Sequence, residues 1–495
     1  MIRILPRDIS HLKADSSFSF EIDSIAPDKS ISHRSAMFAL LSDKPSIIRN
    51  YLQAEDTLST LSIAKALGLQ VESIDKDTLK LTPPKQFSEP NCVLDCGNAG
   101  TAMRLYVGLL AGLAGSVKMP KEFRASNDIN NDISDNISNA SDGFYCVLSG
   151  DKYLCARPMN RVITPLKNIG AHIFSRQNGL APLSIISTQL DGFIYESKIA
   201  SAQVKSAMIL AALHGKDKST YIEPSLTRPH TESMLLGMNA PIKIENIDST
   251  SSHCSPQTRG RKIGISPLTK ALEPLDFAVP CDPSSAFYFA IAAAITPNSE
   301  ILLKNVALNP TRIEAYKILE KMGAKVRYEN ITTKYEEVGD IYVTSGNLEG
   351  VKVEENIAWL IDELPALSIA MALANGVSEV RNAKELRVKE SDRIKAVLEN
   401  LATLGVGYEE REDGYVIYGG GFFSHNHSKN LATLKAQNLS IDSKIPQIKS
   451  FGDHRIAMSF AIAGIITPLE IDDESCINIS FPNFLEILSK IAKIN

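Results

Sequence analysis

The feature of this sequence that most constrains its fold is a pattern that recurs six times. Six short segments are rich in alanine and apolar on nearly every side, as helices are when other elements cover them completely. They are residues 35–41, 101–115, 202–213, 284–295, 365–374 and 456–464. Their small side chains would let them pack closely beneath sheets. The pattern predicts six buried helices, each at the centre of one repeated α/β unit.

A second motif alternates with these buried segments. It is an amphipathic helix that ends at a glycine or a similar stop and leads directly into a strand-like run. A weaker copy occupies residues 230–244. The clear copies occupy residues 60–74, 164–175, 312–328 and 393–410. The two motifs together predict six similar α/β units, three in each of two domains.

Length and charge limit the classes of protein that the chain can belong to. Its 495 residues exceed what one compact core usually holds, which also favours two domains. The net charge of −5 provides no basic surface for nucleic acid or an anionic membrane, so an anionic ligand would require cations gathered locally. No segment approaches the roughly 20 apolar residues that span a bilayer.

Compartment and metal content are predicted from the N-terminus and the cysteines. The N-terminus lacks the apolar core of a signal peptide. The seven cysteines are odd in number and form no CxxC pair, which favours free thiols in a reducing cytoplasm over disulfides or a metal site. We therefore expect a cytoplasmic protein without bound metal.

Polar residues precede or open each of the six buried segments. These clusters lie at residues 28–34, 97–104, 201–203, 282–285, 361–363 and 452–455. A single cluster would be explained by helix capping alone. Six clusters that include arginines and a lysine favour anion binding, because a helix N-terminus offers free N–H groups and the positive end of its dipole.

Six of the polar segments resemble the signature segments of the 5-enolpyruvylshikimate-3-phosphate synthase (EPSP synthase) family, in that family's order. They read "DKSISHR", "GNAGTAMR", "RPMNR", "SAQVKSA", "RVKESDRI" and "GDHRIAM", and they span residues 28–458. The resemblance implies a two-domain inside-out α/β barrel of six βαβαββ-type units. The first domain would comprise residues 1–22 and 278–495, and the second residues 23–277. Insertions are expected at residues 117–144, 246–260 and 425–447.

The same resemblance implies a reaction. The enolpyruvyl group of phosphoenolpyruvate would pass to the 5-hydroxyl of shikimate 3-phosphate, giving 5-enolpyruvylshikimate 3-phosphate and phosphate on the route to chorismate and the aromatic amino acids. This chemistry requires cations for two phosphates and two carboxylates, a base for the hydroxyl and an acid for the methylene carbon. It requires no metal or redox cofactor, and we expect a monomer whose partners are these two small molecules.

The resemblance also implies which residues form the site. For shikimate 3-phosphate they are Lys29, Ser30, Arg34, Ser201, Ala202, Gln203, Asp362 and Lys389. For phosphoenolpyruvate they are Lys29, Gly100, Arg157, Gln203, Arg393 and Arg455. Asp362 would be the base, Glu390 the proton donor, and Lys29 a catalytic cation that touches both substrates. Glu363 is a competing carboxylate beside Asp362.

Several alternatives stay open on the sequence alone. Asn98, Thr101 and Arg104 would either support the turn at Gly100 or contact a ligand directly. Ile479 stands where the better-studied branch of the family has a lysine. The rival enzyme is UDP-N-acetylglucosamine enolpyruvyl transferase, which shares the fold and the donor but opens with a Lys-Asn pair and often carries a loop cysteine. A non-catalytic protein that binds small anions is the alternative from another class.

Overall fold

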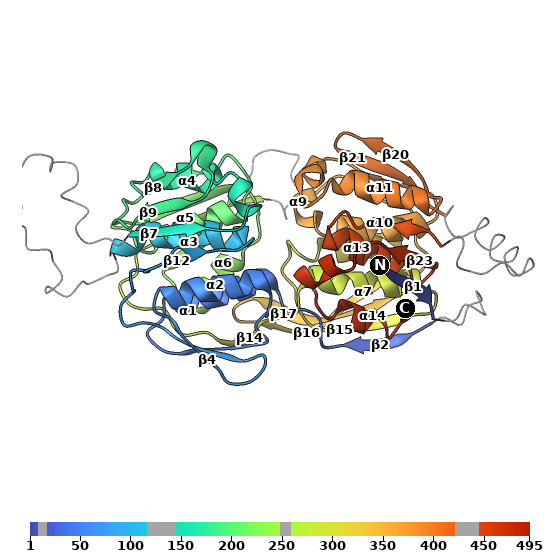
Figure 1. Ribbon diagram of the computed structural model, residues 1–495, viewed down its shortest axis with the longest axis horizontal. Helices are drawn as coiled ribbons and strands as arrows, with labels where there is room; N and C mark the ends of the chain where they lie inside the picture. Colours follow the sequence, from blue (N-terminus) through green and yellow to red (C-terminus); the bar gives the residue numbers. More distant parts are fainter. Residues whose placement is uncertain (8–16, 116–144, 248–258, 421–444) are drawn as a thin grey trace, which may run out of the picture. The chain divides into compact units, whose positions relative to one another are not determined.

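The chain forms two compact units in the computed structural model, which describes residues 1–7, 17–115, 145–247, 259–420 and 445–495 (Figure 1). Unit 1 consists of Met1–Asp28 and Pro280–Asn495, and unit 2 of Lys29–Val279. The insertion expected at 117–144 lies outside the described residues, as do most of those at 246–260 and 425–447. Among the described residues, no helix is long and apolar enough to cross a bilayer.

The described part of unit 2 contains three four-stranded sheets with one strand plan. In each sheet the first two strands are parallel and the other neighbouring pairs are antiparallel. In order of neighbours the strands are β14 (Asp276–Ala278), β3 (Ser46–Arg49), β5 (Leu79–Thr82) and β4 (Gln70–Ser73); β6 (Leu94–Asp95), β7 (Tyr145–Ser149), β9 (Leu183–Ile186) and β8 (His172–Ser175); and β10 (Ile194–Glu196), β11 (Ser219–Ser225), β13 (Arg259–Ile265) and β12 (Ile242–Asn246).

Unit 1 repeats this plan in the three sheets that its described residues form. The pairing again runs parallel, antiparallel, antiparallel. The strands are β2 (Ser19–Ile22), β15 (Glu300–Ala307), β17 (Glu337–Thr344) and β16 (Lys325–Thr333); β18 (Lys352–Val353), β19 (Val377–Val380), β21 (Gly414–Tyr418) and β20 (Gly407–Arg411); and β22 (Gln447–Ile448), β23 (Leu469–Ile471), β1 (Ile2–Pro6) and β24 (Ala492–Ile494).

Each unit completes one sheet with a strand from the far end of its own sequence. In unit 1, β1 lies between β23 and β24, where Ile4 pairs with Leu469 on one side and with Ile494 on the other. In unit 2, β14 is the last strand along the chain and pairs in parallel with β3, near the start. Neither unit can therefore complete its sheets until its whole sequence is available.

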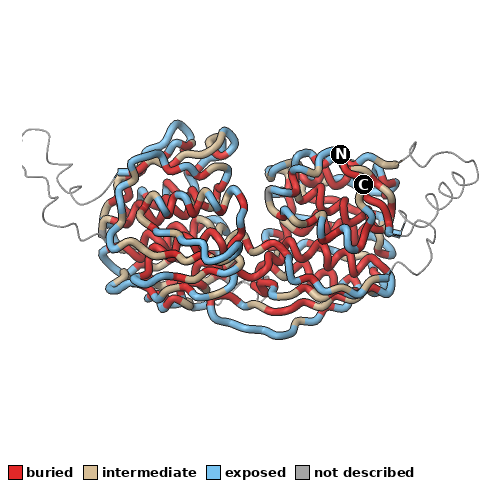
Figure 2. The backbone as a smooth tube through the Cα atoms, turned by 60° about the horizontal axis from the view of Figure 1, so that its bottom comes forward, coloured by how far each residue is buried: buried red, intermediate tan, exposed pale blue. Residues whose placement is uncertain are grey.

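The six buried helices expected from the sequence are all present. They are α1 (Lys29–Ala39), α3 (Gly100–Gly112) and α5 (Ala202–Ala212) in unit 2, and α7 (Pro283–Ile295), α10 (Leu364–Leu373) and α13 (His454–Ala463) in unit 1. Figure 2 shows buried residues filling the interior of each unit, with exposed residues around them. The prediction of six repeated α/β units is confirmed.

The amphipathic helices lie where the second motif predicted them, with one addition. They are α2 (Glu55–Ala66), α4 (Asn160–Lys167), α6 (His230–Gly237), α8 (Glu314–Met322), α11 (Arg393–Thr403) and α14 (Phe484–Leu488). The sequence pattern did not reveal α14, because five residues are too few to show a helical period. Shorter helical elements are α9 (Ile357–Leu360), η1 (Leu113–Gly115), η3 (Leu154–Ala156), η4 (Gln177–Gly179), η6 (Lys384–Val388) and η8 (Ser475–Ile479).

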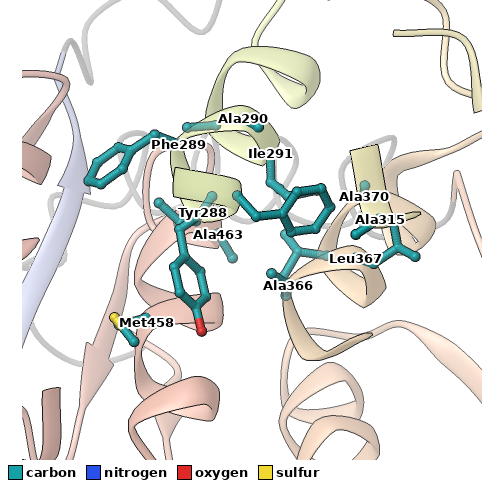
Figure 3. Close-up of a cluster of buried hydrophobic side chains, with 14 of the residues drawn as sticks. Tyr288, Phe289, Ala290, Ile291, Ala315, Ala366, Leu367, Ala370, Met458 and Ala463 are labelled. Atoms are coloured by element: carbon teal, nitrogen blue, oxygen red, sulfur yellow. The ribbon is translucent and has the colours of Figure 1, made fainter. Parts of the chain in front are cut away.

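Alanines and a few large side chains fill the core of unit 1, where α7, α10 and α13 meet (Figure 3). The ring of Phe289 on α7 lies 5.5 Å from that of Phe484 and 6.1 Å from that of Phe481, between ring centroids. These contacts attach the short α14 to the buried helix. Alanine on the facing helices leaves room for such rings without separating the backbones.

In unit 2, glycine brings α3 and α5 into direct backbone contact. A Cβ atom added at Gly108 would lie 2.2 Å from the carbonyl oxygen of Ala207 and 2.5 Å from its Cα. Neither atom can move without shifting the helix. The close approach holds together the two helices whose first residues belong to the candidate site.

We predict that Gly108→Ala destabilises the protein. Alanine ordinarily favours a helix over glycine by about 1 kcal/mol, but here the backbone clash outweighs that gain, and we expect a net loss of about 2 kcal/mol in unfolding free energy. Urea-induced unfolding measures this loss in unfolding free energy. Gly264→Ala in β13 is the matched control, because its added Cβ would meet only the Lys243 carbonyl oxygen at 3.8 Å. Equal stability of the two variants would contradict the prediction.

Candidate active site

The polar clusters of unit 2 meet at the first turns of α1, α3 and α5. Lys29 is the first residue of α1, and its ammonium forms an ion pair with Asp56 near the start of α2. The lysine side chain is 35% exposed, so an incoming anion can reach it. The sequence reasoning missed Asp56, because nothing in the local pattern links it to Lys29.

Arg34 joins three helices. Its Nε donates to Oγ1 of Thr231 at 2.8 Å, and its Nη2 donates to Oγ of Ser206 at 3.1 Å. Its Nη1 donates to the carbonyl oxygen of Ser30 at 3.0 Å. The guanidinium is nearly buried. It therefore fixes the first turn of α1, with Ser30, against α5 and α6.

His33 is a buried support for the same turn. Its Nδ1 lies 2.6 Å from Oγ1 of Thr60 on α2, and the Tyr106 hydroxyl donates to the Thr60 carbonyl at 2.8 Å. Burial, reinforced by the charges of Lys29 and Arg34, lowers the pKa of His33 well below its usual value. The imidazole is therefore neutral at physiological pH and adds no cation.

Gly100 and Gln203 meet between the starts of α3 and α5. Arg104 donates from Nη1 to Oε1 of Gln203 at 2.8 Å, and Gln203 donates from Nε2 to Oγ1 of Thr101 at 3.1 Å. A Cβ atom added at Gly100 would lie 2.9 Å from the Arg104 Nη1. Thr101 and Arg104 therefore support Gln203 and the glycine turn.

Ser201, Ala202 and Asn98 lie around this corner. Ser201 caps α5, since its Oγ accepts from the Val204 amide at 3.4 Å, and Ala202 is the first helical residue. Asn98 is exposed on the turn before α3. The three residues leave polar groups at the helix starts open to a small molecule.

Three arginines gather near the start of α3 without acidic partners. Burial, together with the charges of Arg161 and Arg157, lowers the pKa of Arg104 to about 10. Arg157 and Arg161 are exposed, and within the described ranges none of the three forms an ion pair with a carboxylate. Such repulsion is relieved by an anion. Arg161 was overlooked although it stands four residues after Arg157 in "RPMNR".

The lysine of "SAQVKSA" does not belong to this group. Lys205 is fully buried and forms ion pairs with Glu223 at 3.0 Å and with Glu232 at 2.7 Å. Burial raises the pKa of Glu223, while Lys205 opposes that rise. This part of the signature segment is structural, since it joins α5 to β11 and α6.

In unit 1, one buried guanidinium brings together carboxylates from three segments. Arg393, the first residue of α11, donates from Nη2 to Oε2 of Glu390 at 2.6 Å and from Nε to Oδ2 of Asp453 at 2.9 Å. Its Nη1 lies 3.3 Å from Oδ1 of Asp362. The structure thus brings Asp362, Glu390 and Arg393 together. Asp453 was missed as a partner, although it stands in the "GDHR" cluster.

The two adjacent carboxylates before α10 have different surroundings. The Asp362 side chain is 25% exposed. Glu363 is buried and accepts a hydrogen bond from the Ser284 hydroxyl at the start of α7. Ser284 in turn accepts from Nη2 of the buried Arg312 at 2.8 Å. Of the two, Asp362 is the carboxylate that a substrate can reach.

Arg455 has unused donors. The residue is 9% exposed, and its Nε and Nη1 have no close hydrogen-bond partner in the part of the chain that the structure describes, although the side chain interacts with the Tyr288 hydroxyl. Burial raises the pKa of the nearby Tyr288 to about 12, and the Arg455 charge opposes this rise. A buried guanidinium with open N–H groups is suited to hold a carboxylate or phosphate.

Lys389 and Glu390 lie on the segment between η6 and α11. The Lys389 ammonium donates to Oε1 of Glu385 at 2.5 Å. The Glu390 side chain is 45% exposed. The Ile479 side chain lies outside the described residues.

Comparisons with known proteins agree with this arrangement. The family profile of EPSP synthase (3-phosphoshikimate 1-carboxyvinyltransferase) matches residues 14–488. The chain is 53% identical over 491 residues to a 3-phosphoshikimate 1-carboxyvinyltransferase of Nitratiruptor sp., covering 98% of this chain and 99% of the relative. It is 52% identical over 478 residues to the enzyme of the same name from Wolinella succinogenes, covering 96% and 95%.

A solved structure of EPSP synthase from Acinetobacter baumannii superposes with a TM-score of 0.79 at 31% identity, covering 100% of this chain and 99% of that one. The likeness in sequence and in fold therefore extends over nearly the whole length of both proteins. The chain belongs to the EPSP synthase (3-phosphoshikimate 1-carboxyvinyltransferase) family.

Proposed function

We propose that this protein transfers the enolpyruvyl group of phosphoenolpyruvate to the 5-hydroxyl of shikimate 3-phosphate, with Asp362 and Glu390 as its acid–base groups. The observation that carries the assignment is the meeting of both carboxylates at Arg393, each still accessible to solvent. The products are 5-enolpyruvylshikimate 3-phosphate and phosphate, an intermediate step toward chorismate and the aromatic amino acids.

The chemistry divides into addition and elimination. Glu390 gives a proton to the methylene carbon of phosphoenolpyruvate while Asp362 takes the proton of the 5-hydroxyl, whose oxygen bonds to the central carbon. The tetrahedral intermediate then loses phosphate by C–O cleavage as Asp362 returns its proton to the leaving phosphate, and the new methyl group gives a proton back to Glu390, which restores the double bond. Lys29 balances charge near the bond-forming atoms.

Different cationic residues are assigned to the two phosphates and two carboxylates of the substrates. We assign the acceptor to Lys29, Ser30, Arg34, Ser201, Ala202, Gln203, Asp362 and Lys389. For the donor we assign Lys29, Gly100, Arg157, Gln203, Arg393 and Arg455. Planar guanidinium groups can each bind a carboxylate or phosphate through two parallel hydrogen bonds. The open donors of Arg455 support its place in the second set.

The alternative functions differ in the second substrate that phosphate release from phosphoenolpyruvate would require. A UDP-N-acetylglucosamine enolpyruvyl transferase would release phosphate from phosphoenolpyruvate only with the nucleotide sugar, and a non-catalytic anion-binding protein would release none. Release that depends on shikimate 3-phosphate is the result expected here. The names of the relatives favour it.

We also propose that the protein acts as a monomer in the cytoplasm, with domain boundaries near residues 22 and 277. The six described cysteines are free, which suits a reducing compartment. Light scattering of the purified chain tests the monomer. Limited proteolysis tests the boundaries.

We predict that Asp362→Asn and Glu390→Gln each lower kcat by about 10² to 10⁴, the usual contribution of a proton-transfer group. Binding of shikimate 3-phosphate, measured by calorimetry, should change little in the Glu390 variant. Glu399→Gln is the matched control, because this exposed carboxylate lies on α11 away from Arg393. Normal turnover in either site variant would disprove its assigned role.

Gly100→Ala should weaken donor binding through Arg104. The added methyl group would displace Nη1, which now fixes Gln203. We expect glyphosate to compete with phosphoenolpyruvate for this space, and we expect the variant to show a higher KM for phosphoenolpyruvate, weaker inhibition by glyphosate and an unchanged KM for shikimate 3-phosphate. Steady-state kinetics measures all three, and Gly264→Ala serves again as the control. Donor and glyphosate constants that do not change would refute this steric argument.

A further inference from the structure

The segment that carries Lys389 and Glu390 has little backbone support. Within the described part of the chain, the amides of Glu390, Ser391 and Asp392 make no backbone–backbone hydrogen bond. We call residues 388–392 the acid loop. Its conformation depends on side-chain contacts, and the contact of Asp392 with Arg387 is the one that joins the loop to the neighbouring hairpin.

Arg387 lies immediately before the acid loop and uses all three guanidinium nitrogens. Its Nη1 donates to Oδ2 of Asp392 at 2.9 Å, which joins the residues on either side of Lys389 and Glu390. Its Nη2 donates to Oε1 of Glu410 at 2.9 Å and to the Arg411 carbonyl at 2.6 Å. Its Nε donates to the Glu412 carbonyl at 2.8 Å. Arg387 therefore closes the loop and fixes it to the β20–β21 hairpin.

Asp392 links this contact to the start of α11. While Oδ2 accepts from Arg387, its Oδ1 accepts from the Lys395 amide at 3.1 Å and caps α11. Through Asp392, Arg387 therefore fixes both the conformation of the acid loop and the start of α11, whose first residue is Arg393.

A second contact fixes the loop from the other side. Ser391 donates to Oδ2 of Asp453 at 2.9 Å, the same oxygen that accepts from Arg393. Val388, Lys389 and Glu390 lie between these two anchors, and the Glu390 amide makes no backbone–backbone hydrogen bond in the described part of the chain. The anchoring therefore restricts the two residues that the reaction requires and leaves their side chains accessible.

We propose that Arg387 is a positioning residue for Lys389 and Glu390. It touches neither substrate and acts by holding the acid loop against the hairpin. Lysine cannot replace it, because one ammonium lacks the planar fork that reaches four acceptors. The inference rests on the proposed function, since it assumes the roles assigned to Lys389 and Glu390.

Stability alone does not account for these contacts. The carboxylate partners of Arg387 are 34% and 45% exposed, and ion pairs near the surface contribute little to folding. Arg381 offers a comparison outside the acid loop, because it pairs with Glu379 at 2.7 Å and its side chain is 46% exposed. A purely structural role of Arg387 would lower the melting temperature without a selective loss of kcat.

The test compares Arg387→Met, Arg387→Lys and Arg381→Met by steady-state kinetics and thermal unfolding. We expect both Arg387 variants to lose about 10-fold to 100-fold in kcat, the usual effect of displacing a reacting group by about an ångström. The KM for shikimate 3-phosphate should rise through Lys389, with melting temperatures close to that of Arg381→Met. Normal kinetics in Arg387→Lys, or an equal loss in Arg381→Met, would overturn the proposal.

A double-mutant cycle with Glu390→Gln tests whether Arg387 affects turnover through Glu390. If Arg387 acts through Glu390, adding Arg387→Met to Glu390→Gln should lower kcat by less than threefold further, because the group it positions is already disabled. Fully multiplicative losses would overturn the proposal. Normal turnover in Glu390→Gln alone would instead disprove the assigned acid, whereas a slow Glu390→Gln with a normal Arg387→Met would refute only the positioning role.

Discussion

The candidate site of unit 1 depends on one buried charge. Arg393 is among the largest fully buried side chains of the chain, and a guanidinium removed from water is tolerated only when acceptors surround it. Asp362, Glu390 and Asp453 supply them from three separate segments. The same interaction that makes the buried cation tolerable therefore brings three carboxylates, among them the proposed acid and the proposed base, to one cation.

The repeated architecture explains why polar groups collect there. In each unit the three buried helices begin beside one another, as the contacts of Ser284 with Glu363 and of Arg393 with Asp362 and Asp453 show for α7, α10 and α13. Small residues permit this closeness. Helix starts carry unpaired N–H groups and a positive dipole end, so a threefold repeat of buried helices produces a polar surface on an otherwise apolar core.

Neighbouring residues in the sequence acquire different roles from their surroundings. Asp362 and Glu363 are indistinguishable by pattern, yet Glu363 is held in a buried network with Ser284 and Arg312, whereas Asp362 remains open to solvent. Lys205 in a signature segment is likewise committed to two buried glutamates. A motif therefore identifies the segment of a site, and the packing around each side chain decides whether it can meet a ligand.

The sequence by itself determined the six buried helices, five of the six amphipathic helices and the segments that carry the site. Periodicity, glycine stops and signature residues are local properties that a single chain displays. Only the tertiary structure revealed the short α14, the pairing of Lys29 with Asp56, the place of Arg161 beside Arg104 and the enclosure of Glu363. These depend on contacts between residues far apart in the chain, which form when helices pack and buried charges require partners.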